Sequence, residues 1–143
     1  MNAESNLGGL LGKSSRLLAN RFNNDLGKYS LTIAQWTLLA VLWERDHQNQ
    51  KELQEELLKD KATITSLITY LIKNGFITKS KDIMDRRSFI VSLTDKGREV
   101  QGVTIPIAIQ NITLATQGIT QQDLKTTYKV LTQVITNLTK ENV

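Results

Sequence analysis

Hydroxyl groups gather at helical spacing between residues 61 and 70, and two guanidinium groups follow further along the chain. The hydroxyl-bearing residues are Thr63, Thr65, Ser66, Thr69 and Tyr70. The apolar residues between positions 64 and 72 include Ile64, Leu67, Ile68, Leu71 and Ile72, at steps of three and four, which predicts a helix with one apolar face. Short hydroxyls can donate and accept hydrogen bonds at close range. Together with Arg86 and Arg87, they suit the base edges and phosphates of a nucleic acid.

The basic charge of the chain is concentrated in one segment. The 143 residues carry a formal net charge of +4. Between residues 73 and 98 lie seven basic and three acidic residues, so this segment alone accounts for the excess. The basic residues are Lys73, Lys79, Lys81, Arg86, Arg87, Lys96 and Arg98. Such a patch is the electrostatic footprint of polyanion binding, although a solvated charged loop is an alternative that the charges alone leave open.

The residue types exclude several classes of function. The chain has no cysteine and one histidine, His47. Disulfides, thiolate metal sites, thiol redox sensing and Ser-His-Asp or Cys-His catalysis are therefore not expected. We also find no phosphate-cradling glycine loop. We expect no catalytic residue, no metal site and no cofactor, and we expect His47 to lie on a surface loop.

Composition predicts one folded domain over residues 1–143. Apolar residues make up 40% and charged residues 22% of the chain, as in ordinary globular domains. No apolar run approaches 18 residues, and the N-terminus lacks a basic-then-apolar signal pattern. We therefore expect a soluble, cytoplasmic protein.

The first half of the chain has the pattern of a helix-turn-helix. A helix is predicted over residues 7–26, ended by Gly27, and a second over 33–44, where Thr32 and Gln35 form a capping box. A polar loop over 45–50 leads to a short helix over 50–58. Asp60 then caps the helix that begins at residue 61. Two short helices joined by a tight turn, the second with an exposed polar face, are typical of this motif.

A projecting hairpin follows the second helix of that motif. Gly75 suits the left-handed end of a helix, and strands are predicted over residues 76–79 and 89–93. The connection between them is too long for a two-residue turn, so it should form a charged wing. Thr94 and Asp95 restart a helix.

The last third is predicted to be two helices. The first spans about 95–116 with a kink at Pro106, and Gly118 separates it from the second. Apolar residues of the second helix recur at steps of four and three, which suits packing against another helix. The candidate dimerisation residues are Leu7, Leu10, Leu11, Leu124, Tyr128, Leu131, Ile135 and Leu138.

Several motifs of the chain resemble the MarR (multiple antibiotic resistance regulator) family of bacterial transcription factors. The most specific is the run from Asp85 through Arg87 to Gly97, which is similar to a D-x-R wing tip leading into an L-T-x-x-G helix start. The Leu31–Trp36 and Thr63–Ile77 segments support it. Two positions depart from the family's usual pattern: Ile33 stands where Pro is frequent, and Leu53-Gln54 where Leu-Ala is frequent.

This resemblance implies a mainly helical fold with a small β wing. The winged helix-turn-helix lobe would comprise residues 30–98, and residues 1–29 and 99–143 would form a helical dimerisation region. It further implies a homodimer that binds a pseudo-palindromic DNA operator and represses transcription until a small lipophilic or phenolic ligand releases it. A winged-helix module that binds protein rather than DNA is the alternative, although a charged wing suits a dry protein interface poorly.

The candidate DNA-binding residues lie on the helix that is predicted to begin at residue 61 and on the wing. They are Lys61, Thr63, Thr65, Ser66, Thr69, Lys81, Asp85, Arg86 and Arg87. By resemblance, Arg87 enters the minor groove, where negative potential favours arginine, and Asp85 holds it through an ion pair. The alternative for Thr63 is that it acts only in the helix cap. The alternative for the wing residues is an exposed ion-pair network that contributes little.

A ligand pocket is predicted between the DNA-binding and dimerisation regions. Its candidate lining is Phe22, Trp36, Trp43 and Ile107. Large apolar side chains of this kind are also ordinary core residues, which is the alternative for all four.

Overall fold

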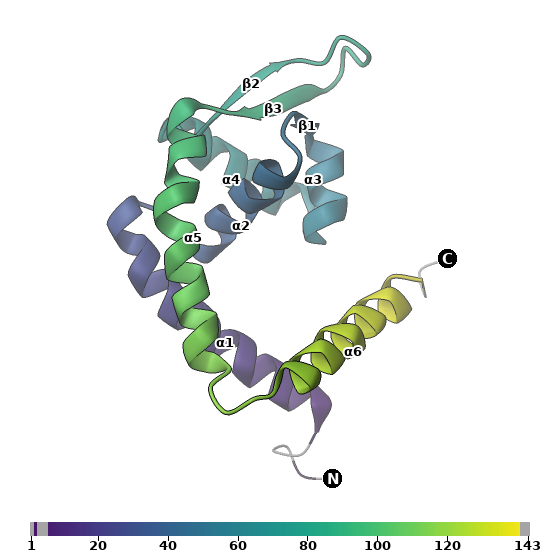
Figure 1. Ribbon diagram of the computed structural model, residues 1–143. Helices are drawn as coiled ribbons and strands as arrows, with labels where there is room; N and C mark the ends of the chain where they lie inside the picture. Colours follow the sequence, from purple (N-terminus) through teal and green to yellow (C-terminus); the bar gives the residue numbers. More distant parts are fainter. Residues whose placement is uncertain (1, 3–5, 141–143) are drawn as a thin grey trace. The chain divides into compact units, whose positions relative to one another are not determined.

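A computed structural model describes residue 2 and residues 6–140 (Figure 1). The helices are α1 (Leu7–Leu26), α2 (Ile33–Glu44), α3 (Gln50–Leu57), α4 (Lys61–Lys73), α5 (Asp95–Ala115) and α6 (Gln121–Lys140), with a short 3-10 helix, η1, at Gly27–Tyr29. The strands are β1 (Gln48–Asn49), β2 (Ile77–Lys81) and β3 (Phe89–Leu93). The expected fold class, mainly helical with a small β wing, is confirmed. The chain forms two compact units, residues 1–111 and 112–143.

Three successive helices of the first unit begin at side-chain caps. Thr32 and Gln35 form the predicted capping box of α2, and Asn49 and Glu52 form another at α3. Asp60 caps α4 by accepting a hydrogen bond from the Thr63 amide at 2.7 Å. These caps satisfy amides that have no partner within the helix, so the starts of the helix-turn-helix are set by local sequence.

Helix α4 ends in a Schellman motif before the wing. Gly75 has φ +80°, the Phe76 amide donates to the Leu71 carbonyl at 2.9 Å, and the Gly75 amide donates to the Ile72 carbonyl at 3.0 Å. Glycine adopts this left-handed conformation without steric cost. The motif turns the chain from α4 directly into β2.

The wing is the outer part of a three-stranded antiparallel sheet with the order β1-β3-β2. Strand β3 pairs with β2 from Ile77↔Leu93 to Lys81↔Phe89, and with β1 at Gln48↔Val91. The expectation of a simple polar loop over 45–50 was wrong, because Gln48 and Asn49 form β1. Two polar residues carry no alternating pattern, so this strand is defined only by its partner. Figure 1 shows the β2–β3 hairpin extending beyond β1.

The core of the first unit centres on α2, which contacts α1, α3, α4 and β3. Its Leu38, Leu39 and Leu42 are completely buried. Helix α4 contributes Ile64, Leu67, Ile68 and Leu71 to this core. Ile72 was also predicted on the apolar face of this helix, but its side chain is not buried, since the residue is 37% exposed.

The end of α1 differs in mechanism from the prediction. Gly27 has ordinary right-handed helical geometry, with φ −55°, and the chain continues as η1. The left-handed residue is Ser30, with φ 59°. Glycine at position 27 is therefore not required by backbone conformation.

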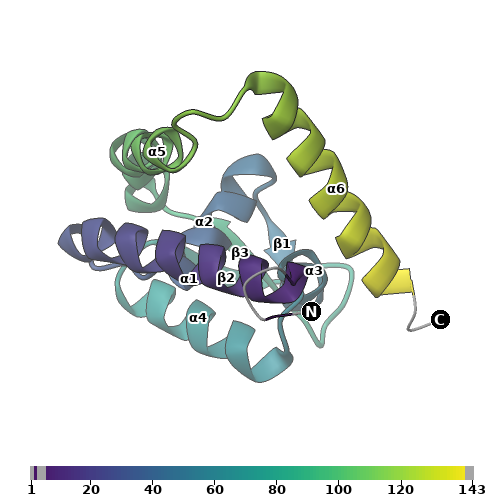
Figure 2. The same cartoon turned by 90° about the horizontal axis from the view of Figure 1, so that it is seen from below.

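The second unit contains the end of α5 and the whole of α6. Helix α6 starts where the Thr120 hydroxyl accepts from the Asp123 amide at 3.1 Å, and both views show it as one uninterrupted helix (Figures 1 and 2). None of its described residues is buried, although Tyr128, Ile135 and Leu138 are apolar or aromatic. None of the described helices is long and apolar enough to cross a membrane.

Candidate nucleic-acid interface

The outer face of α4 presents hydroxyl groups to solvent. Thr63, Thr65, Ser66 and Thr69 are all exposed, while the opposite face of the helix is packed into the core. Burial of the apolar face therefore determines which side chains point outward. The structure places all four predicted hydroxyl residues on one accessible surface.

Thr63 also belongs to the helix cap. Hydrogen bonds from Thr63 to the Asp60 carboxylate lower the pKa of Asp60. The bond from the backbone amide has the larger effect on this pKa, and the bond from the side-chain hydroxyl has the smaller one. Lys61, the first residue of α4, is exposed next to this cap. A cation beside the amides of a helix N-terminus suits a phosphate group.

Two aspartates hold the tip of the wing. The Asp82 carboxylate accepts from the Met84 amide at 2.9 Å and from the Ser88 hydroxyl at 3.2 Å. The Asp85 carboxylate accepts from the Arg87 backbone amide at 3.0 Å. The predicted Asp85–Arg87 ion pair is replaced by this backbone hydrogen bond. Asp85 thus shapes the turn and leaves the Arg87 guanidinium without an ion-pair partner among the described residues.

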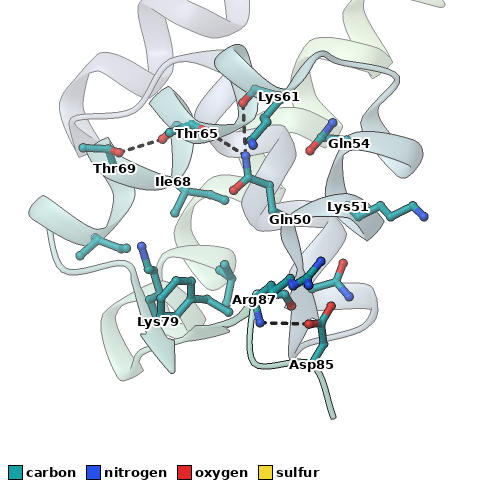
Figure 3. A pocket seen from close by; sticks show the side chains of 15 residues that line it. Gln50, Lys51, Gln54, Lys61, Thr65, Ile68, Thr69, Lys79, Asp85 and Arg87 are labelled. Atoms are coloured by element: carbon teal, nitrogen blue, oxygen red, sulfur yellow. Dashed lines mark hydrogen bonds between the residues drawn. The ribbon is translucent and has the colours of Figure 1, made fainter. Parts of the chain in front are cut away.

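A hollow of about 440 Å³ lies between α3, α4 and the wing (Figure 3). The predicted residues that line it are Lys61, Thr65, Thr69, Asp85 and Arg87. Thr63, Ser66, Lys81 and Arg86 do not line it, and Lys81 instead borders a second hollow along β2. The structure therefore brings the two predicted elements, helix and wing, together around one concavity.

Six further polar residues of the hollow were not predicted as site residues. They are Asn49, Gln50, Lys51, Gln54, Lys79 and Ser88. Lys79 was recognised only as part of the basic segment; its ammonium lies 4.3 Å from the centroid of the Phe89 ring, a cation–π contact across the hairpin. The signal for Gln50 and Lys51 was their place at the start of α3, directly after the Asn49 cap, and Gln54 follows one turn later. Helix α3 contacts α4.

The candidate ligand residues form an aromatic cluster in the first unit. Phe22 and Trp36 meet edge to face with centroids 4.9 Å apart, and Trp36 and Trp43 at 5.6 Å. The Trp36 indole donates to the Thr104 hydroxyl at 2.8 Å, and the Trp43 indole donates to the Gly97 carbonyl at 2.9 Å. Phe22 is buried, whereas both tryptophans are half-buried against the core, as is Ile107.

The candidate dimerisation residues are accessible in the single chain. Leu7 and Leu10 on α1 are about half exposed, and Leu11 is partly buried. On α6, Leu124 and Leu131 are partly buried, and the exposed residues are Tyr128, Ile135 and Leu138.

His47 is exposed, as expected, but it is not a free loop residue. Its Nδ1 lies 2.7 Å from the Ser92 hydroxyl of β3, and its backbone has φ 59°. This contact accompanies the pairing of β1 with β3.

Known proteins with related sequences are transcriptional regulators. The sequence profile of the MarR family matches residues 31–89. The organic hydroperoxide resistance transcriptional regulator of Bacillus subtilis is 29% identical over 99% of this chain and 95% of its own length. Regulators of this kind are not enzymes, which confirms the expectation for this chain.

Solved structures extend the match over almost the whole fold. A MarR protein from Peptoclostridium difficile has a TM-score of 0.90 and 29% identity, covering 96% of this chain and 90% of its own. A putative MarR family regulator from Listeria monocytogenes, solved in complex with a 26mer DNA, has a TM-score of 0.89 and 22% identity over 96% of this chain and 91% of its own. By sequence profile, curated relative and solved structure, the chain is therefore similar to MarR family transcriptional regulators.

Proposed function

We propose that this protein is a homodimeric, sequence-specific DNA-binding repressor of the bacterial cytoplasm. In this proposal α4 enters the major groove and the wing reaches the adjacent minor groove of a pseudo-palindromic operator. The observation that carries it is the hollow between α3, α4 and the wing, where hydroxyl, ammonium and guanidinium groups gather on one surface. That combination suits the base edges and phosphates of DNA.

Each group in the interface has a proposed role. Thr65, Ser66 and Thr69 contact base edges, and Lys61 binds a phosphate together with the amides at the start of α4. Arg87 inserts into the minor groove, positioned by the hydrogen bond from its amide to Asp85. Arg86 and Lys81 bind flanking phosphates. The Listeria protein of the same fold was solved in complex with a 26mer DNA, which supports DNA binding as the use of this fold.

The dimer is proposed from the exposed apolar surface of α1 and α6. Residues 1–29 and 99–143 would pair two chains, and residues 30–98 would form the DNA-binding lobe of each. Leu7 is 56% exposed and Leu138 is 62% exposed in the single chain. Apolar stripes of this length at helical spacing are stable when a second chain covers them. A dimer would also present two wings and two recognition helices to one duplex.

A small lipophilic or phenolic effector is proposed to bind beside the aromatic cluster of Phe22, Trp36 and Trp43. The half-buried indoles offer aromatic surface at the edge of the core. The relative from Bacillus subtilis is named for organic hydroperoxide resistance, but this chain has no cysteine that a peroxide would oxidise. The proposed effector therefore acts by binding rather than by thiol oxidation.

The DNA-binding proposal is tested by selecting duplexes from a random pool and measuring their affinity by fluorescence anisotropy. We expect one enriched palindromic motif, with log Kd rising linearly with log salt because phosphate contacts release counterions. A protein-interaction module would enrich no motif. Failure to enrich any sequence over a scrambled duplex would overturn the proposal.

Arg87→Ala and Arg86→Ala form a matched pair for the wing. Both remove one positive charge from the tip, so a purely electrostatic role predicts equal losses. We expect Arg87→Ala to weaken operator binding about 100-fold, well beyond Arg86→Ala, because only Arg87 enters the groove. The melting temperature and the dimer should be unchanged in both. Equal affinity for wild type and Arg87→Ala would remove Arg87 from the interface.

The effector proposal has a direct optical test. The chain contains two tryptophans, and both belong to the aromatic cluster, so tryptophan fluorescence, excited where tyrosine does not absorb, reports on this place alone. Titration with 4-hydroxybenzoate and with unsubstituted phenol should quench the emission and raise the operator Kd over the same concentration range. Loss of operator affinity with unchanged emission would place the effector elsewhere.

A further inference from the structure

We infer that Gln50 and the backbone of α4 give Thr65 and Thr69 different hydrogen-bonding roles toward DNA. Thr65 keeps its hydrogen free to donate to a base, whereas Thr69 can only accept from one. This inference rests on the proposed function, because it assigns the chemistry with which the same helix would distinguish bases. Gln50 is then a specificity-determining residue even without touching DNA itself.

Thr65 is restricted by the side chain of Gln50. The Gln50 amide nitrogen lies 2.6 Å from the Thr65 hydroxyl oxygen and 3.3 Å from the Lys61 carbonyl oxygen (Figure 3). A carbonyl oxygen can only accept, so the side-chain amide must present its NH₂ group to both atoms. The hydroxyl of Thr65 therefore accepts from Gln50, and its own hydrogen remains for an acceptor in the groove.

Thr69 is restricted in the opposite sense by its own helix. Its hydroxyl donates to the Thr65 backbone carbonyl at 2.8 Å, one turn earlier. A hydroxyl has one hydrogen, so this bond leaves Thr69 with only lone pairs toward the groove. Thr65 and Thr69 both line the hollow, so a donor and an acceptor stand one helical turn apart on the same surface.

The neighbouring hydroxyls are not arranged in this way. The hydroxyl of Thr63 is engaged by the Asp60 carboxylate in the cap of α4. The Ser66 hydroxyl has no hydrogen bond within the described part of the chain, and it lies outside the hollow. The fixed polarity is therefore a property of Thr65 and Thr69, which face the same concavity.

A hydroxyl with a free hydrogen and a hydroxyl that can only accept favour different bases in the major groove. A donor suits the keto oxygens of guanine and thymine, whereas an acceptor suits the amino groups of adenine and cytosine. We therefore expect a keto base opposite Thr65 and an amino base opposite Thr69, on one base pair or on adjacent ones. A wrong base would leave one buried polar group unpaired, which weakens binding about tenfold.

Gln50→Glu tests the inference by engaging the free hydrogen of Thr65. A carboxylate only accepts, so the Thr65 hydroxyl would donate to Glu at position 50 and would present a lone pair to the base. Gln54→Glu is the matched control, because it adds the same charge one turn later on α3 and Gln54 also lines the hollow. Thr69→Val removes the acceptor and keeps the shape of the side chain.

The measurement is selection from a random duplex pool with all four proteins. We expect one position of the enriched motif to change from guanine or thymine to adenine or cytosine with Gln50→Glu, by about tenfold. Gln54→Glu should weaken binding without changing that position, and Thr69→Val should lose the preference for an amino base at a second position. An unchanged motif with Gln50→Glu, or the same change with Gln54→Glu, would overturn the inference. A wild-type protein that enriches nothing would instead refute DNA binding itself.

Discussion

Helix α2 in the first unit has three completely buried leucines, whereas α6 in the second has no buried residue over its described length. Both helices carry many apolar side chains, but only α2 has several elements of its own unit packed around it. The difference indicates that residues 1–111 contain their own core, while the apolar stripe of α6 needs a surface that its own unit does not provide. The proposed dimer would supply that surface.

The largest expected effect on the stability of the first unit comes from a substitution at Gly97, where α5 packs closely against the backbone of Phe76. A Cβ on Gly97 would lie 2.1 Å from the Phe76 carbonyl oxygen, a backbone atom that cannot swing away. We expect Gly97→Ala to lower the free energy of unfolding by about 3 kcal/mol, measured by urea denaturation.

Gly102 provides the control on the same helix. A Cβ there meets nothing within 4 Å, so Gly102→Ala should stabilise the helix by about 0.5–1 kcal/mol. Equal effects of the two substitutions would show that the junction of α5 with the wing is not tightly packed, and the contrast between the units would weaken.

A charged residue in the α6 stripe should separate the chains without unfolding them. Leu138→Glu is expected to raise the dimer dissociation constant on the order of 100-fold, because it places a carboxylate in an apolar contact. Sedimentation velocity measures the dissociation constant, and circular dichroism should show unchanged helix content. Gln133→Glu, with the same charge at a polar position of α6, should leave the dimer intact. A monomeric wild type would contradict the proposed use of this helix.

A smaller effect is expected from a polar contact inside the first unit. The Trp36 indole donates to Thr104, whose hydroxyl in turn donates to the Val100 carbonyl at 2.7 Å. Trp36→Phe should cost about 1 kcal/mol beyond the lost apolar area, since it removes one partly buried hydrogen bond. A double-mutant cycle with Thr104→Val measures that coupling. Zero coupling would mean that the aromatic cluster is held by packing alone.

The smallest effect is the pH dependence of the α4 cap. Hydrogen bonds from Thr63 lower the pKa of Asp60 below its ordinary value of 3.8. The folded state therefore binds this proton less readily than the unfolded state, and the stabilisation is present above pH 3.8 and disappears as the pH falls through the lowered pKa. Wild type should melt slightly higher than Asp60→Asn at neutral pH, and the two should converge in acid. A difference that is constant with pH would exclude the charge as its cause.

The sequence predicted the parts of the fold that depend on local chemistry. The caps at Thr32, Asn49 and Asp60 and the turn at Gly75 involve residues within a few positions of one another, so spacing alone identifies them. Strand β1 was not predictable, because its two residues become a strand only by pairing with residues more than 40 positions away. His47 and Leu58 adopt left-handed backbone conformations without being glycine, and no local pattern indicates that.

In the candidate site, too, the features that depend on local sequence were predicted, and those that depend on contacts between elements were not. The hydroxyl face of α4 follows from helical periodicity, and all of its members are exposed as predicted. The role of Gln50 was missed because it depends on how α3 lies against α4. The Asp85 contact was predicted with the correct partner residue but with the wrong atoms, since a sequence shows opposite charges and not whether a carboxylate meets a guanidinium or an amide.

The central position of β3 has a consequence for how this wing can change over evolutionary time. Its Val91 is paired with β1 on one side and β2 on the other, so a slip by one residue would break both ladders and turn the buried Val91 outward. Insertions or deletions are therefore tolerable only between Lys81 and Phe89, beyond the last paired residues. Such changes would alter how far the tip extends while the base of the hairpin stayed in place. The reach of Arg87 could thus be adjusted to a new operator without rebuilding the fold.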